Sequence, residues 1–154
     1  MTGHRVFSTI HANTAPDAIN TLINMNIRPF LITSSLLCIL AQRLVRKLCP
    51  DCRKEFQPEP EILQEMSLKD GQVTIYQAEG CEKCNHTGYF GRTAVYELLR
   101  ITPTMKNAIL AEQSIEQIVK IASSEGMKSL FEKGVNKVSE GATSIDEIYR
   151  VLKF

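Results

Sequence analysis

Four cysteines in two Cys-x-x-Cys pairs are the residues best suited to chemistry in this sequence. The pairs are Cys49-Pro-Asp-Cys52 and Cys81-Glu-Lys-Cys84. A two-residue spacer lets the backbone turn tightly and direct two sulfurs at one ion, and two such turns complete a tetrahedral shell of thiolates. Because protein ligands fill that shell, no position is left for a reactive water. The spacing therefore predicts a structural zinc site.

Other assignments of the cysteines remain open at this point. Iron suits the same four ligands, and four buried free thiols or a redox pair are the remaining alternatives. His86 follows Cys84 closely enough to replace a ligand, although a surface position in the second turn suits it better. The fifth cysteine, Cys38, lies in an apolar stretch, where we expect a core residue without further function.

The sequence around the pairs has the composition of a small insertion held together by metal. Prolines and glycines crowd residues 49–99, and helical periodicity there is limited to residues 61–66. Residues 73–77 and 93–99 are predicted as short strands. We expect residues 49–99 to form a tetracysteine zinc-binding subdomain.

The residues before the first pair predict a strand followed by two helices. Residues 5–10 are rich in β-branched and aromatic side chains and predict a buried strand. Thr14, with a proline and an aspartate after it, predicts a helix start. A second helix is expected over residues 29–45, buried because its apolar residues surround it on all sides.

The residues after the second pair predict a bundle of four helices over residues 100–154. The helices are expected to begin near Thr102, Ser114, Met127 and Ser144. The spacing Ser-x-x-Gln from Ser114 and Ser-x-x-Glu from Ser144 predicts capping boxes. Gly134 is an unusual interior residue for the third helix.

Composition and charge limit the class of protein. The 154 residues carry a net charge of +1, whereas dedicated nucleic-acid binders usually show a basic excess. Residues 30–41, the most apolar stretch, are about half as long as a membrane-spanning helix. The first four residues do not resemble a secretory leader. We expect a cytoplasmic chain without a transmembrane segment, in which stable disulfides are rare.

His4 and His11 flank the predicted first strand. In a straight strand they would lie about 20 Å apart, too far to share one ligand. The residues alone therefore predict two solvated histidines at the ends of a strand.

This segment resembles the His box of the type II secretion and type IV pilus assembly ATPases. The resemblance continues in order along the chain, through Ala15-Pro-Asp-Ala-Ile, Ala41-Gln-Arg-Leu-Val45, both cysteine pairs, Cys84-Asn-His-Thr-Gly-Tyr-Phe-Gly-Arg92 and Gly141-Ala-Thr-Ser-Ile-Asp-Glu. No single segment is decisive, but the ordered set covers essentially the whole chain and is highly specific.

The resemblance implies a mixed, helix-rich α/β fold. Residues 1–48 would be the C-terminal part of a RecA-like P-loop ATPase core, followed by the zinc subdomain and the helical bundle. It also implies a hexameric motor that binds ATP and Mg²⁺ at the cytoplasmic face of the bacterial inner membrane. Its partners would be neighbouring subunits, an inner-membrane platform protein and cytoplasmic assembly proteins. Members that retract pili generally lack the metal subdomain, so its presence favours secretion or pilus extension.

Site residues carry over from the family only where the motifs match. His4 and His11 match the His-box histidines, which lie near the nucleotide phosphates in the family. Arg43 matches an arginine of a recurring stretch and is a candidate nucleotide-binding residue. Cys49, Cys52, Cys81 and Cys84 match the metal ligands.

The sequence departs from the family in its phosphate-binding motifs. None of its eight glycines is followed by lysine, so there is no Gly-x-x-x-x-Gly-Lys-Ser/Thr loop, and the acidic Walker B end is missing too. We therefore expect ATP and Mg²⁺ to bind only in the parent protein, and this chain alone to be inactive.

Two alternatives to the motor fragment remain. A free-standing zinc module could bind protein or nucleic acid through the cations near the first cysteine pair, which are Arg43, Arg46, Lys47, Arg53 and Lys54. A structural scaffold with no ligand but zinc would also fit these residues.

Overall fold

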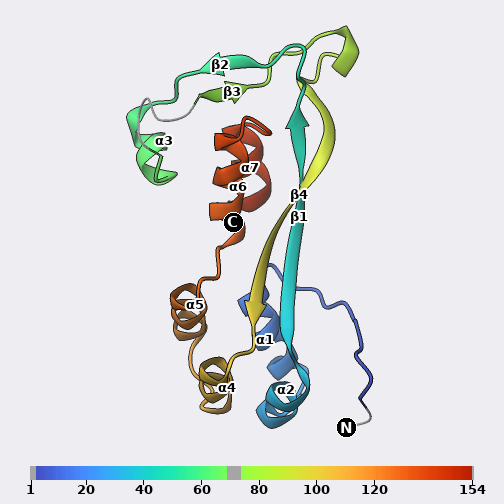
Figure 1. Cartoon of the computed structure of the whole chain (residues 1–154), viewed down its shortest axis with the longest axis vertical. Coiled ribbons are helices and arrows are strands. Elements are labelled where there is room, and N and C mark those ends of the chain that lie inside the picture. Colours follow the sequence, from blue (N-terminus) through green and yellow to red (C-terminus); the bar gives the residue numbers. More distant parts are fainter. Residues whose placement is uncertain (1–2, 69–73, 154) are drawn as a thin grey trace. The chain divides into compact units, whose positions relative to one another are not determined.

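The computed structural model describes residues 3–68 and 74–153. They form two compact units, each built from two separate stretches of sequence. Unit 1 comprises Met1–Ala41 and Leu98–Met127, and unit 2 comprises Gln42–Glu97 and Lys128–Phe154. The mixture of helices and strands confirms the predicted α/β character (Figure 1).

Strands β1 (Cys38–Leu48) and β4 (Tyr89–Arg100) pair in a two-stranded sheet, and each contributes residues to both units. Their arrows run in opposite directions in Figure 1. In residues 3–68 and 74–153, no helix has both the length and the apolar character needed to cross a bilayer.

Unit 1 is a helical cluster around an apolar core. It contains α1 (Ala15–Asn24), α2 (Pro29–Ser35), α4 (Pro103–Leu110) and α5 (Ile115–Ser124). Helix α5 packs on α1 and α4, and α4 also packs on α2. The buried core residues are Ala15, Ile19, Ile32, Leu99, Ile101, Met105, Ala108, Ile109, Ile118 and Ala122.

Local capping explains where two of these four helices begin. The Thr14 hydroxyl accepts the backbone N–H of Asp17 at 3.2 Å, so the predicted start of α1 is confirmed. Thr102 caps α4 in the same way. The capping box predicted at Ser114 is wrong, because that hydroxyl bonds the Glu116 side chain and makes no capping bond to the backbone of α5.

The predicted helix over residues 29–45 is also wrong beyond Ser35. The hydroxyls of Ser34 and Ser35 both donate to the carbonyl of Leu31, which competes with continued helix geometry. The chain then extends into β1, whose side chains alternate between exposed and partly or fully buried positions. Pairing with β4 supplies the backbone hydrogen bonds of this segment. Cys38 is accordingly an exposed strand residue and not a core residue.

Residues 5–10 do not form the predicted buried strand. Val6 is 84% exposed and Phe7 97% exposed. A strand needs a hydrogen-bonded partner, and the sheets of the described residues contain only β1 with β4 and β2 with β3. Residues 5–10 have the composition of a strand but no strand to pair with, so their backbone is irregular.

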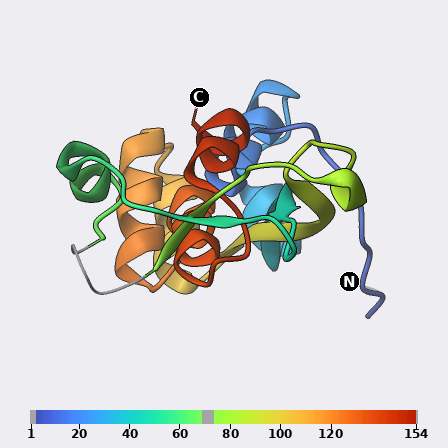
Figure 2. The ribbon, with the colours of Figure 1, turned by 90° about the horizontal axis from the view of Figure 1, so that it is seen from above.

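The described residues of unit 2 include two short strands, three helices and a 3₁₀ turn. Strands β2 (Lys54–Phe56) and β3 (Ile75–Gln77) pair antiparallel, with Glu55 opposite Tyr76. The helices are α3 (Pro60–Glu65), α6 (Leu130–Ser139) and α7 (Ile145–Leu152), and the 3₁₀ turn η1 covers Glu82–Cys84. Figure 2 shows β3 lying over α6, on which it packs.

Helices α6 and α7 pack closely because Gly134 lies between them. A Cβ atom on Gly134 would come within 2.6 Å of Leu152 Cδ1 and 3.0 Å of Ile148 Cδ1. The helix-breaking residue noted in the sequence therefore permits close contact of the two helices. Ser144 caps α7, accepting the N–H of Glu147 at 3.2 Å. The reciprocal half of the predicted capping box is absent, because the Glu147 carboxylate bonds Arg46 and Arg150 instead.

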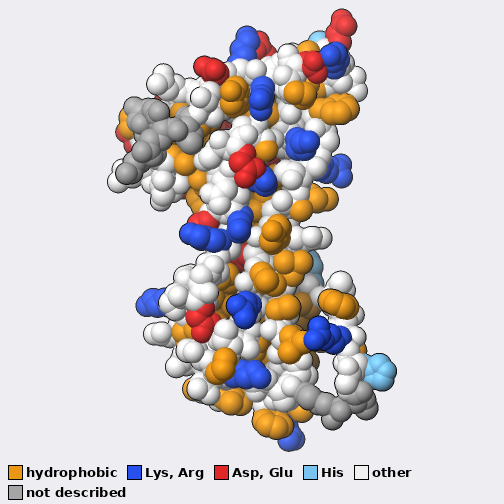
Figure 3. Space-filling view, viewed as in Figure 1, with side chains coloured by type: hydrophobic (Ala, Val, Ile, Leu, Met, Phe, Trp, Pro, Cys, Tyr) orange, Lys and Arg blue, Asp and Glu red, His pale blue; other side chains and the backbone are white. Residues whose placement is uncertain are grey.

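Several apolar side chains of β1 and β4 are exposed. They include Leu40, Leu44, Phe90, Tyr96 and Leu98. Figure 3 shows hydrophobic side chains interspersed with charged ones on the face that it draws. Apolar residues in β1 and β4 are thus found at both exposed and buried positions.

Candidate metal centre

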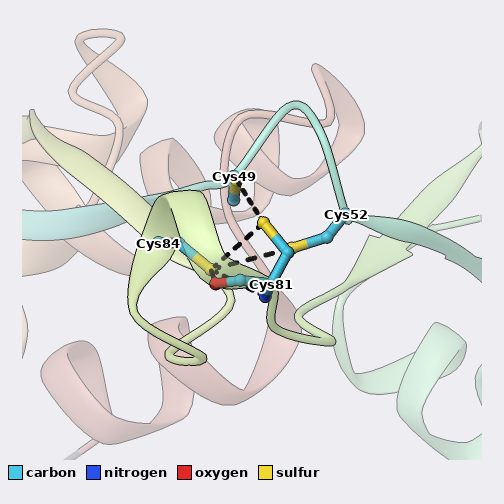
Figure 4. A group of neighbouring side chains, drawn as sticks. All are labelled: Cys49, Cys52, Cys81 and Cys84. Atoms are coloured by element: carbon cyan, nitrogen blue, oxygen red, sulfur yellow. Dashed lines mark hydrogen bonds between the residues drawn. The ribbon is translucent and has the colours of Figure 1, made fainter.

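The structure brings the four cysteine sulfurs of the two pairs together (Figure 4). All four Sγ atoms lie within 4.8 Å of one another. The Cys49–Cys81 sulfurs are 3.9 Å apart, and the Cys52–Cys84 and Cys81–Cys84 sulfurs are each 3.8 Å apart. A tetrahedron with metal–sulfur bonds of about 2.3 Å has sulfur–sulfur edges of about 3.8 Å. The cluster therefore has the dimensions of a tetrathiolate metal site.

The first turn follows directly from β1. Leu48 ends that strand, and Cys49 is the next residue. The carbonyl of Cys49 accepts the N–H of Arg53 at 3.0 Å, which closes the turn and directs Cys52 back toward Cys49. Cys49 is buried, and Cys52 is partly buried.

The second turn leads directly into β4. The carbonyl of Cys81 accepts the N–H of His86 at 2.8 Å. Asn85 and His86 both adopt positive φ angles, 51° and 59°, which bend the chain back around Cys84. The N–H groups of Cys81 and Gly88 each donate to Cys84 Sγ at 3.2 Å. These bonds orient the sulfur and stabilise its thiolate.

The two turns are also linked to each other. The N–H of Cys49 donates to the carbonyl of Gly88 at 2.9 Å. An ion pair between Lys83 Nζ and Asp51 at 2.6 Å joins the spacer residues of the two pairs. Both partners of that pair are exposed, so its stabilising effect is small. The backbone bond is the firmer link.

The thiol pKa values show how closely the sulfurs interact. Burial, together with its sulfur neighbours, raises the pKa of Cys52 to about 12. Burial also opposes ionisation of Cys84, but the N–H groups of Cys81 and Gly88 outweigh it and lower the pKa of Cys84 to about 6. The sulfurs are therefore close enough to shift one another's ionisation. Four thiolates at these distances require a cation.

The metal-binding segment is anchored to the turn between α6 and α7. Arg53 Nη1 donates to the carbonyl of Gly141 at 2.6 Å, and its guanidinium stacks on Tyr76. The N–H of Leu48 donates to the carbonyl of Ala142 at 3.0 Å. The hydroxyl of Tyr89 lies 2.6 Å from that of Ser144. The cysteine turns and α6–α7 therefore pack as one unit.

Glu147 reinforces this anchor from the first turn of α7. Its side chain is fully buried, and one carboxylate oxygen accepts the backbone N–H of Arg46 at 2.9 Å. The guanidinium groups of Arg46 and Arg150 donate to the same carboxylate. Burial disfavours the charge, but these donors lower the pKa of Glu147 to about 2. The carboxylate is therefore ionised at neutral pH.

The remaining predicted site residues lie outside the cysteine cluster. His4 and His11 are exposed residues of unit 1, in a segment without regular structure. Arg43 is a half-buried residue of β1 whose Nη1 donates to the carbonyl of Gln42. Among the described residues, the group able to hold a metal consists of the four cysteines alone, so His86 is not part of it.

Sequence reasoning missed two contributors to this region. The sequence alone did not distinguish Gly88 from the other glycines of residues 49–99. Glu147 was visible only as a capping residue, whereas its main partner, Arg46, lies 101 positions away.

Comparison with known proteins gives matches along nearly the whole chain. A family model described as "Type II/IV secretion system protein" matches residues 1–150. "Type IV pilus assembly ATPase PilB" of Thermus thermophilus is 40% identical over 151 residues, covering 96% of this chain and 17% of that protein. "Type II secretion system ATPase E" of Vibrio cholerae is 43% identical, covering 99% of this chain and 30% of its own length.

A third relative agrees with these two. "Type II secretion system protein E" of Aeromonas hydrophila is 44% identical, and the match covers 99% of this chain and 30% of that protein. The chain therefore spans less than a third of the length of each of these three curated relatives.

Proposed function

The chain belongs to the type II/IV secretion system protein family, and we propose that it is the C-terminal part of a hexameric cytoplasmic ATPase. The parent protein powers type II protein secretion or type IV pilus assembly. It works at the inner-membrane surface, with neighbouring subunits, a platform protein and cytoplasmic assembly proteins as partners.

The extent of the similarity is the observation that carries this proposal. The match to two kinds of ATPase runs over 96% or more of the chain and is not confined to the cysteine segment. A free-standing zinc module that binds protein or nucleic acid is not favoured, because such a module would share only the metal-binding segment with these relatives.

Within the parent protein, we assign the four cysteines to a structural zinc ion. The sulfur spacing fits zinc–thiolate bonds, and no position is left for a reactive water. When bound, zinc cross-links the two turns. The chain's own residues then hold those turns against α6 and α7. The metal site thus stabilises an element of the motor without taking part in phosphoryl transfer.

Nucleotide binding is assigned to the parent protein and not to this chain alone. His4 and His11 would face the nucleotide phosphates, and Arg43 is a candidate nucleotide-binding residue. Phosphoryl transfer needs a cradle for the phosphates and ligands for Mg²⁺, and the motifs that supply them are missing from this sequence. We further propose a RecA-like part in residues 1–48, a zinc subdomain in residues 49–99 and helices in residues 100–154.

One preparation of the purified chain tests these assignments together. Elemental analysis should find one zinc per chain, which Cys52→Ser removes and the matched control Cys38→Ser retains, because Cys38 is exposed and outside the cluster. The same preparation should show no Mg²⁺-dependent ATP turnover. Turnover that is lost in a His4→Ala/His11→Ala double variant would refute the nucleotide assignment. A colourless protein without zinc, or one containing iron, would refute the metal assignment.

A further inference from the structure

Gly88 lies where the second cysteine turn meets β4, and its peptide groups contact both turns. Its N–H donates to Cys84 Sγ at 3.2 Å. Its carbonyl accepts the N–H of Cys49 at 2.9 Å. One residue thus bonds to the last cysteine of the second pair and to the first cysteine of the first pair. Any displacement of Gly88 would move the two pairs relative to each other.

Two constraints make glycine necessary at this position. The φ angle of Gly88 is +75°, a left-handed conformation that other residues adopt only with strain. A Cβ atom would also lie 2.5 Å from the Cβ of Ala78 and 3.1 Å from its Cα and carbonyl carbon. Those are rigid atoms of the segment between β3 and Cys81, so they cannot move aside as the end of a long side chain can.

We propose that Gly88 is a positioning residue of the metal centre, which sets the separation of the two cysteine pairs through its peptide groups and close contact with Ala78. This inference rests on the proposed tetrathiolate site. Outer contacts to metal ligands affect metal affinity because they fix ligand orientation before the ion binds. A side chain at position 88 would push apart Gly88 and Ala78, which flank the second turn.

Gly91 offers a matched control for the backbone conformation. Its φ angle is +74°, but a Cβ atom there would have no heavy atom within 4 Å. Gly91→Ala therefore imposes the same left-handed strain as Gly88→Ala without a collision. The difference in metal affinity between the two variants therefore measures the effect of the contact between residues 88 and 78 and of the link between the cysteine turns.

The experiment is a Co²⁺ titration of the whole chain, followed by the thiolate-to-cobalt charge-transfer absorption. Wild type should give the spectrum of a tetrahedral tetrathiolate site. Gly88→Ala should bind Co²⁺ about 10–100-fold more weakly, the range typical for loss of an outer contact. Gly91→Ala should stay within about 3-fold of wild type, because its ligands are undisturbed.

A second substitution keeps the test decisive even if Gly88→Ala folds poorly. Ala78→Gly removes the Cβ atom at 2.5 Å, the closest that the new side chain would meet, and leaves the two backbone atoms at 3.1 Å. Gly88→Ala/Ala78→Gly should therefore recover part of the lost affinity. Equal Co²⁺ affinities for Gly88→Ala and Gly91→Ala would overturn the inference, as would a double variant no better than Gly88→Ala. Failure of wild type to give a tetrathiolate spectrum would instead overturn the metal site itself.

Discussion

Replacing Glu147 by glutamine keeps the shape of a buried side chain but removes its charge. In the wild type, one carboxylate accepts the N–H of Arg46 and bonds two guanidinium groups, tying α7 to β1. Glutamine retains a single acceptor oxygen and introduces an NH₂ group facing the cations of Arg46 and Arg150. The change therefore tests how much the ionised carboxylate stabilises unit 2.

The expected magnitude follows from the pKa of Glu147. Folding lowers it from 4.5 to about 2, which corresponds to about 3 kcal/mol of stability at neutral pH. Because the folded pKa is depressed, this stability is fully present above about pH 4.5 and is lost as the pH falls toward 2. By pH 3.5, the difference between wild type and Glu147→Gln should shrink by about 1 kcal/mol.

Urea unfolding followed by tyrosine fluorescence measures this difference. The chain has four tyrosines and no tryptophan, and every tyrosine falls within unit 2, so the signal reports on that unit. Loss of metal at low pH destabilises both proteins alike, so comparing them at each pH isolates the carboxylate. Glu140→Gln is the control, since its exposed pair with Lys137 should contribute no more than about 1 kcal/mol.

Two results would refute the reasoning. A Glu147→Gln variant within about 1 kcal/mol of wild type at pH 7 would mean that the buried carboxylate contributes no more than a surface ion pair does. A wild-type advantage that stays constant from pH 7 to pH 3.5 would mean that the charge of Glu147 is not its source.

Two further predictions concern unit 2. Removing the metal with a chelator should speed hydrogen exchange in the cysteine turns and also in the α6–α7 turn, because Arg53 and Tyr89 bind residues of that turn. Helices α4 and α5 should keep their protection. Unchanged exchange around Gly141 would contradict this coupling. Gly134→Val should destabilise unit 2 by about 1–3 kcal/mol in the same urea assay, because its Cβ would meet Leu152 and Ile148. A urea unfolding midpoint equal to that of wild type would contradict this, because it would show that α7 can shift at no cost.

The sequence allowed prediction of features that depend on near neighbours. The Cys-x-x-Cys spacing identified the cluster because each turn is a local structure, and Figure 4 shows the four side chains converging. The caps at Thr14 and Ser144 were predictable for the same reason, since each bond spans three residues.

Features that depend on distant partners were not predictable. The residues of β1 have good helix propensity, but pairing with β4 overrides it. Residues 5–10 have strand composition, but a strand forms only where another strand is available. The contact of Arg46 with Glu147 and the contact of Gly88 with Ala78 arise from tertiary packing, which periodicity does not report.

The bond between Cys49 and Gly88 has a consequence for how the gene for such a chain can change. Residues 49–88 leave the β1–β4 ribbon and rejoin it at points only one hydrogen bond apart, 2.9 Å. A segment with adjoining ends can be removed or exchanged as a cassette, with a short reverse turn closing the ribbon in its place. The cost of such a deletion would fall on the α6–α7 turn, which would lose the Arg53 contact with Gly141.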